Sequence, residues 1–266
     1  AVSHGEDQDL LAVLKGGQRL FCKLRSGNQG DSAFACWTQS GAVAGETLDG
    51  TPLLEQATVL AQWQRLCRKG PALIQPLLPC HGDLAKMKGV SVRYPAIDKA
   101  TGKLFNLEDR IRNCRVKNQK AAEWTFESDE LVAMTLAVTS SSRGLPLQAQ
   151  IDGAAKSHFE NGQRLFMTRQ GQMNLACTNC HDQHYGQKLY TDPLSQVQAN
   201  GYPLYRIDWQ RVASLERRLR FCYTGVRAEI PPWGHSDMRD ISLYLMWRGQ
   251  GLLVEAPAVG RCARRL

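Results

Sequence analysis

The chain has 266 residues, 43% of them hydrophobic, which suits one large domain or two small ones with apolar cores. No run approaches eighteen uninterrupted apolar residues, so we expect no transmembrane helix. The net charge of +8 makes nucleic acid a possible partner. No base-reading motif accompanies the charge, so we expect no nucleic-acid partner. A basic cleft that attracts small anions or an acidic protein fits the charge better.

Residues 1–49 are rich in Gly, Ser and Asp and contain Cys22 and Cys36. We expect an irregular N-terminal extension here. Its opening, AVSHGEDQDL, is typical of a processed protein. The chain holds nine cysteines, an odd number, so at least one sulfur has no disulfide partner within the chain. So many cysteines indicate an exported protein with disulfides or a covalent cofactor.

A nine-residue segment occurs twice, as NLEDRIRNC at 106–114 and as SLERRLRFC at 214–222. In each copy two apolar residues and the final cysteine fall at i, i+4 and i+7, which predicts one face of a helix ending at the cysteine. Each copy precedes an apolar segment, 127–147 or 235–255, that predicts a helix with a glycine-rich stop. Strand signals are sparse and short.

The repeat extends upstream, because a Cys-His pair precedes each copy, in PCHGD at 79–83 and in NCHDQ at 179–183. We therefore predict a mainly α chain with two similar tandem domains, residues 50–150 and 151–266, joined through GLPLQAQIDG.

The segment ACTNCHD contains Cys177, Cys180 and His181 in the spacing that attaches c-type heme. Two thiols one helical turn apart reach the two vinyl groups of the porphyrin, and the histidine that follows ligates the iron. A thioredoxin-like motif would need a βαβ setting, and a zinc site would need a second cysteine pair. The second domain is thus predicted to be a cytochrome c domain with covalent heme c.

The first copy of this motif is incomplete. Cys80 and His81 are present, but Leu77 stands where the first cysteine would be. We predict a cytochrome c-like domain that has lost its heme, and therefore one heme per chain. An emptied pocket would bring Cys80 near Cys114, and we expect these thiols to form a disulfide in an oxidising compartment.

The second axial ligand of the iron has several candidates. Methionine is the ordinary choice in cytochromes c, and Met238, in a predicted loop, and Met246, on an apolar helix face, lie downstream. The repeat favours Cys222, since the matching position of the first copy is also a cysteine. A disulfide of Cys222 with Cys67 or Cys262 is the structural alternative.

Four arginines stand close to Cys222 in the sequence: Arg217, Arg218, Arg220 and Arg227. Positive charge favours the thiolate form of a cysteine and would hold an oxyanion beside it. Arg218 has a counterpart in Arg110 and could serve the fold, whereas Arg227 matches Gln119 and is the better candidate for chemistry special to the second domain. Either could instead be a solvated surface charge.

Several long segments resemble the SoxA family, the larger subunit of the SoxAX cytochrome of bacterial thiosulfate oxidation. They are GQRLFMTRQGQMNLACTNCHDQHYGQKL, GYPLYRIDWQRVASLERRLRFCYTGVRAE, LYLMWRGQG and, in the first domain, CHGDLAKMKGVSVRYPAID. The resemblance covers most of residues 50–258. It implies a periplasmic heterodimer with a SoxX-like small cytochrome, and Leu77 places this chain with single-heme members.

By this resemblance Cys222 ligates the iron opposite His181 and can carry a persulfide, while Arg218 and Arg227 bind thiosulfate. The implied activity is that of an L-cysteine S-thiosulfotransferase, which joins thiosulfate to a cysteine of a SoxYZ-like carrier and passes electrons through heme to an acceptor cytochrome. The alternatives are a plain periplasmic electron carrier with His–Met ligation, and a thiosulfate dehydrogenase that forms tetrathionate.

Overall fold

The computed structural model describes residues 84–189, 192–206 and 209–260. Within these ranges helices dominate and the strands are two or three residues long, so the mainly α prediction is confirmed. None of the helices in these ranges is both long and apolar enough to cross a bilayer. The predicted N-terminal extension, Leu77, Cys80, His81 and the extra cysteines Cys22, Cys36, Cys67 and Cys262 lie outside the described residues.

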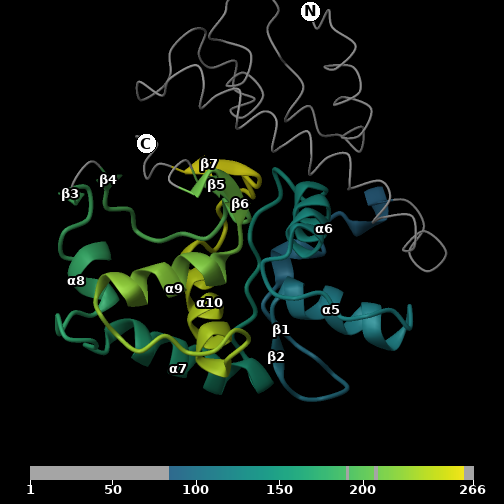
Figure 1. Ribbon diagram of the computed structural model, residues 1–266, viewed down its shortest axis with the longest axis horizontal. Helices are drawn as coiled ribbons and strands as arrows, with labels where there is room; N and C mark the ends of the chain where they lie inside the picture. Colours follow the sequence, from purple (N-terminus) through teal and green to yellow (C-terminus); the bar gives the residue numbers. More distant parts are fainter. Residues whose placement is uncertain (1–83, 190–191, 207–208, 261–266) are drawn as a thin grey trace, which may run out of the picture.

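The N-terminal half, residues 84–150, occupies one side of the molecule (Figure 1). Its 3-10 helices η3 and η4 precede an antiparallel pair of strands, and two α-helices follow. Side-chain oxygens of Asn106 and Ser128 cap the two α-helices. The elements are η3 (Leu84–Met87), η4 (Ser91–Arg93), β1 (Ala96–Ile97), β2 (Leu104–Phe105), α5 (Leu107–Lys117) and α6 (Asp129–Ser140).

The C-terminal half, residues 151–260, contains four α-helices, a hairpin and a three-stranded sheet of order β6-β5-β7. In that sheet β5 pairs antiparallel with β6 and parallel with β7. The elements are η5 (Gly153–Ala155), α7 (Lys156–Met167), α8 (Cys177–His181), β3 (Lys188–Leu189), β4 (Asp192–Pro193), β5 (Leu204–Arg206), β6 (Arg211–Ala213), α9 (Leu215–Gly225), α10 (Ser236–Arg248) and β7 (Ala258–Gly260).

Helices α7 and α10 cross in close contact. A Cβ atom on Gly162 would lie 2.1 Å from the carbonyl oxygen of Asp240, so glycine lets the two backbones touch. Around the crossing Phe166, Tyr244 and Met238 are buried in the main apolar cluster. Met238 lies in the first turn of α10, so the prediction that it lies in a loop is wrong.

The 108-residue repeat has a structural counterpart. In each half a Tyr-Pro pair precedes a short strand, an antiparallel partner strand follows, and a capped helix then carries the cysteine, α5 with Cys114 and α9 with Cys222. Both helices run three residues past the cysteine, so the prediction that they end there is wrong. A cysteine side chain does not interrupt helical hydrogen bonds.

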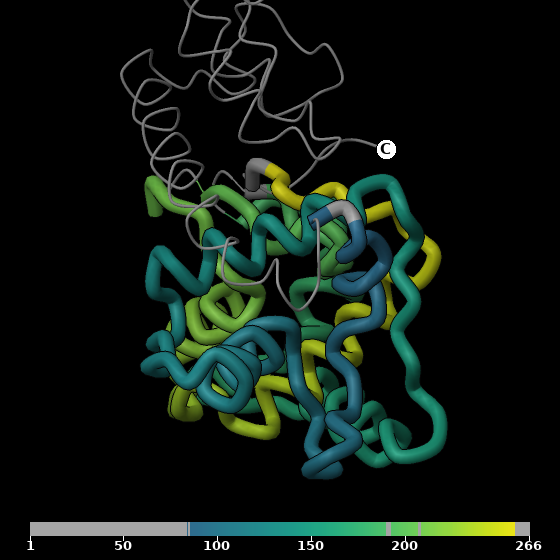
Figure 2. Tube along the Cα trace, turned by 90° about the vertical axis from the view of Figure 1, so that its right-hand side faces the viewer, coloured from purple at the N-terminus to yellow at the C-terminus, as the bar shows by residue number. Residues whose placement is uncertain are grey.

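An extended segment, residues 144–152, leads from α6 to η5 along the edge of the molecule (Figure 2). Its backbone bonds to both halves: the Leu147 amide donates to the carbonyl of Leu252, and the Gln148 amide donates to the carbonyl of Val92, each at 2.9 Å. The connection is thus fixed to the fold along its length.

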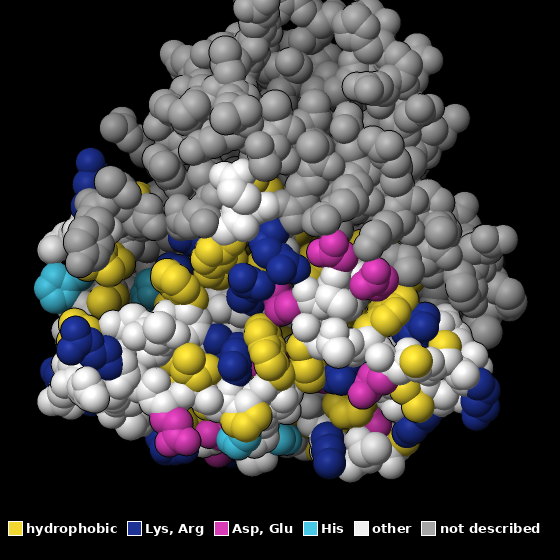
Figure 3. Space-filling view, in the orientation of Figure 1, with side chains coloured by type: hydrophobic (Ala, Val, Ile, Leu, Met, Phe, Trp, Pro, Cys, Tyr) yellow, Lys and Arg dark blue, Asp and Glu magenta, His cyan; other side chains and the backbone are white. Residues whose placement is uncertain are grey.

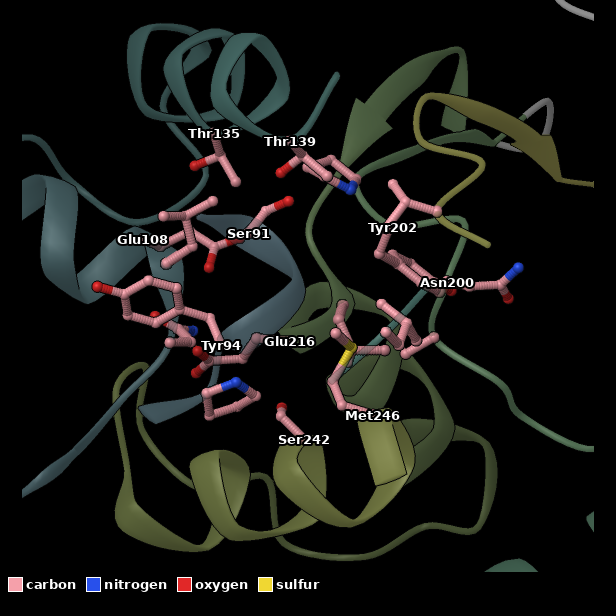
Figure 4. Close-up of a pocket in the computed structure, with 18 residues that line it drawn as sticks. Ser91, Tyr94, Glu108, Thr135, Thr139, Asn200, Tyr202, Glu216, Ser242 and Met246 are labelled. Atoms are coloured by element: carbon pink, nitrogen blue, oxygen red, sulfur yellow. The ribbon is translucent and has the colours of Figure 1, made fainter. Parts of the chain in front are cut away.

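Between the halves lies a cavity of about 70 Å³ (Figure 4). Positions related by 108 residues face it in pairs: Tyr94 with Tyr202, and Glu108 with Glu216. Burial raises the pKa of Glu108 to about 7, and the nearby carboxylates of Asp109 and Glu127 act in the same direction.

Candidate functional site

The loop before α8 brings the two-cysteine motif to the end of α9. A Cβ atom on Gly171 would lie 2.1 Å from the carbonyl oxygen of Val226, so the two chain segments meet backbone to backbone. The amides of Gln172 and Met173 donate to the carbonyls of Arg227 and Val226 at 3.2 and 3.3 Å. These contacts place α8 beside the last turns of α9, where Cys222 lies.

Cys177, Cys180 and Cys222 are all partly buried. Burial raises the pKa of the Cys177 thiol to about 12, and the charges of Cys222 and Cys180 contribute to the same shift. Cys177 also packs against the apolar cluster that contains Phe166 and Leu219. The structure therefore places Cys222 close enough to the two-cysteine motif for its charge to act on Cys177.

His181 is held in one orientation. Its Nδ1 lies 2.7 Å from the carbonyl oxygen of Ser195, so Nδ1–H donates there and the Nε2 lone pair is left for a ligand. Burial lowers the pKa of His181, and the charges of Arg218 and Arg248 lower it further. The lowered pKa favours the neutral imidazole, the form that binds iron.

This donor set fits heme c. Cys177 and Cys180 lie one helical turn apart on a short helix, and the oriented imidazole of His181 follows them. Apolar side chains pack against Cys177. The rival interpretations fit less well. The described residues contain no group of three His, Cys, Asp or Glu arranged to hold a bare metal ion. Helix α8 lies between α7 and the β3–β4 hairpin, not in a βαβ unit.

The four arginines separate in the structure. Arg218 stays with the site, since its charge acts on His181. Arg217 lies 3.7 Å from the carboxylate of Glu127, and Arg220 donates to the carbonyl of Pro231 and covers the ring of Trp233. The side-chain contacts of Arg217 and Arg220 are thus with Glu127, Pro231 and Trp233.

Arg227 follows α9, with an exposed side chain and φ +56°. Its backbone contacts the loop before α8, as described above. This places the residue at the edge of the site, within the loop contact that aligns α8 with α9.

Basic and hydrophobic side chains mix on the face over α9 (Figure 3). The guanidinium carbons of Arg206 and Arg217 lie 5.2 and 5.1 Å from the ring centre of Trp209. The rings of Trp209 and Phe221 form a T-shaped pair with 5.6 Å between ring centres. Arg218 lies 5.4 Å from the ring centre of Phe221. Phe221 is 50% exposed and adjoins Cys222, so this cationic and aromatic surface borders the site.

Sequence reasoning missed two residues of the site. Ser195 acts through its backbone carbonyl and leaves no signal in the sequence. Arg248, at the end of α10, lies 2.6 Å from Asp182 and 4.8 Å from the ring centre of Phe166. Its position inside the segment LYLMWRGQG was the available signal.

Comparison with known proteins gives consistent results. Residues 68–147 match the family described as SoxA/TsdA, cytochrome c domain. The crystal structure of SoxXA from P. pantotrophus superposes on this structure with a TM-score of 0.67 at 33% sequence identity. The match covers 70% of each of the two chains. The chain belongs to the SoxA family.

Two curated SoxA proteins, each named L-cysteine S-thiosulfotransferase subunit SoxA, align over much of this SoxA chain. That of Pseudaminobacter salicylatoxidans is 39% identical over 182 residues, and that of Rhodovulum sulfidophilum is 36% identical over 181. The alignments cover 68% of this chain, but only 64% and 63% of the relatives' own lengths. Heme c is the cofactor that a cytochrome c domain binds. The donor set around His181, which lies outside the matched segment, fits the same cofactor.

Proposed function

We propose that this chain is the SoxA subunit of an L-cysteine S-thiosulfotransferase. Its product would be a carrier cysteine that bears thiosulfate. The observation that carries this proposal is the contact between the loop before α8 and the end of α9, with Cys222 acting on Cys177 and Arg218 acting on the oriented His181. The names of the curated relatives supply the activity.

The proposed reaction joins two sulfurs. The carrier thiol and thiosulfate form one S–S bond, one proton leaves the thiol, and two electrons are removed. Heme, when bound, supplies the route by which these electrons leave one at a time. We assign Arg218 and Arg227 to binding the thiosulfate anion, since guanidinium groups match oxyanions, and Cys222 to the reactive position.

One heme c would be attached through Cys177 and Cys180, and His181 and Cys222 would hold its iron. The supports are the Nδ1–Ser195 hydrogen bond, which leaves Nε2 available, and the influence of Cys222 on the Cys177 thiol. A sulfur bound to iron is a poor nucleophile. If Cys222 holds the iron, its reactivity would require either a thiolate free of the iron or an added outer persulfide sulfur.

We also propose the tandem arrangement of two cytochrome c-like domains, 50–150 and 151–266, after an extension formed by residues 1–49. The repeated order of strands and capped helices supports it. The first domain would have lost its heme and gained a disulfide between Cys80 and Cys114. Cys114 is half-buried on α5, and its proposed partner lies outside the described residues.

The proposed partners are a SoxX-like small cytochrome subunit, a SoxYZ-like carrier and an acceptor cytochrome, all in the periplasm. The structural neighbour is a SoxXA complex by its title, which supports the heterodimer. Cysteine-rich composition and covalent heme attachment are typical of exported proteins, which supports the compartment.

The test is reconstitution of the heme-loaded chain with a small cytochrome subunit, thiosulfate and a carrier protein. Mass spectrometry of the carrier would show a thiosulfate adduct on its cysteine, formed with two electrons per adduct. Electron transfer without an adduct would instead identify a plain electron carrier. Tetrathionate as the product would identify a thiosulfate dehydrogenase.

A further inference from the structure

The two cysteine-bearing helices begin in different ways. In α5 the cap is complete within the helix: the Asn106 amide donates to Asp109 at 3.1 Å, and the Asp109 amide donates back to the Asn106 side chain at 2.8 Å. In α9 the Arg217 amide donates to the Ser214 hydroxyl at 3.2 Å. The residue that matches Asp109 is Arg217 itself, whose side chain accepts no hydrogen bond.

The missing carboxylate comes from the other half of the molecule. The amide of Ser214 donates to Oε1 of Glu127 at 3.1 Å, across 87 residues of chain. The other carboxylate oxygen, Oε2, lies 3.7 Å from the guanidinium of Arg217. Glu127 thus supplies an acceptor and a negative charge at the N-terminus of α9, where a carboxylate is favourable.

The turn that carries Glu127 is fixed against the C-terminal half. The Glu127 backbone has φ +61° and its side chain is 8% exposed. Its carbonyl accepts a bond of 2.8 Å from Arg211, and the neighbouring Phe126 ring stacks on Trp233 at 6.0 Å. A left-handed glutamate costs free energy and persists only where its surroundings hold it.

We propose that Glu127 is a positioning residue, which completes the cap of α9 from the N-terminal half and thereby sets the place of Cys222 relative to His181. Cys222 lies eight residues beyond Ser214, about 12 Å along the helix axis at about 1.5 Å per residue. A change in how this short helix begins therefore moves its far end. The proposal rests on the proposed function where it treats Cys222 as the iron ligand.

The test compares variants of the full heme-loaded chain. Glu127→Ala removes the acceptor and the charge, whereas Glu127→Gln keeps an acceptor for the Ser214 amide. The double variant Glu127→Ala with Arg217→Asp rebuilds the cap inside α9, on the pattern of Asn106 and Asp109. Glu123→Ala is the matched control, because Glu123 is 53% exposed and pairs with Arg112 at 3.0 Å, on α5.

Two measurements are made on each variant: hydrogen exchange of peptides covering residues 214–222, and the electron paramagnetic resonance spectrum of the ferric heme. Glu127→Ala should exchange roughly five-fold faster at the start of α9, the loss expected for a missing cap. It should also add a second ferric species. The exchange rate and the spectrum of Glu127→Gln should lie between those of wild type and Glu127→Ala. Both the double variant and the Glu123→Ala control should match wild type.

Wild-type exchange and spectrum in Glu127→Ala would overturn the proposal, as would a double variant that restores neither. If Glu127→Ala does not load heme, Glu127→Gln decides. Exchange at the start of α9 that is faster than in wild type supports the proposal, and exchange equal to that of wild type overturns it. A wild-type spectrum without a thiolate signature would remove the proposed role of Cys222, while the exchange data would still test the cap.

Discussion

Arg239 of α10 and Asp109 of α5 form an ion pair through two hydrogen bonds, with Nη2 of the arginine 2.6 Å from Oδ1 of the aspartate. The same guanidinium also bonds to Glu216 of α9, and all three side chains are largely buried. One cation thus joins both cysteine-bearing helices to α10.

Removal of this cation should destabilise the protein strongly. Arg239→Ala leaves the carboxylates of Asp109 and Glu216 buried without their partner, and we expect a loss of about 3–5 kcal/mol in the free energy of unfolding. Denaturant unfolding measures this loss. Lys156→Ala, which breaks an exposed pair with Glu160, is the control and should change stability by less than about 0.5 kcal/mol. Equal effects of the two substitutions would show that the triad has no special role.

Glu108 should make stability depend on pH. Its pKa is raised to about 7 in the folded state, against an ordinary value near 4.5, so the folded chain binds the extra proton more tightly. Its contribution to stability is present at low pH and is lost as pH rises from about 4.5 through about 7. Glu108→Gln should remove this dependence and raise stability at pH 8 by about 2 kcal/mol. Parallel pH profiles of wild type and variant would contradict this expectation.

Gly162 should tolerate no side chain. Gly162→Ala would place a Cβ atom 2.1 Å from the Asp240 carbonyl, so α7 and α10 must separate. We expect a loss of about 2–4 kcal/mol in thermal or denaturant unfolding. Gly225→Ala, in the last turn of α9 with no atom within 4 Å of the new Cβ, is the matched control. It should be neutral or slightly stabilising, and a similar loss in both variants would exclude the contact as the cause.

Much of the fold could be predicted because its signals are local. The i, i+4, i+7 pattern of Leu215, Leu219 and Cys222 predicts α9, and the motif around His181 predicts α8 without tertiary information. Met238 was misplaced because Pro231, Pro232 and Trp233 precede it closely. The helix begins directly after that loop, capped by His235, an uncommon residue for this position.

Helical periodicity could have shown which of the arginines on α9 lies on the same side of the helix as Cys222. At about 100° per residue, Arg218 stands some 40° from Cys222, whereas Arg217 and Arg220 stand far around the helix. Helical geometry thus places Arg218, alone among the three, near the line of Cys222, and in the structure the charge of Arg218 acts on His181. The contacts of Ser195 and Glu127 depend on chain segments far apart in sequence, and no local pattern predicts them.

Cys222→Ala should separate cofactor attachment from activity. The thioethers depend on Cys177 and Cys180, so covalent heme should remain, with one iron per chain in the variant and in wild type. Carrier-dependent thiosulfate oxidation should fall to background. Iron analysis, peptide mapping and the carrier adduct assay measure these outcomes. Retained activity would remove Cys222 from the mechanism, and two irons per chain would refute the loss of heme from the first domain.

X-ray absorption at the iron edge of the heme-loaded protein tests the assignment of Cys222 most directly. We predict one sulfur neighbour of the ferric iron in wild type, and its disappearance in Cys222→Ala with the imidazole of His181 retained. A sulfur neighbour that persists in the variant would identify a methionine such as Met238 or Met246 as the ligand, and a wild-type iron without sulfur would contradict the account as well.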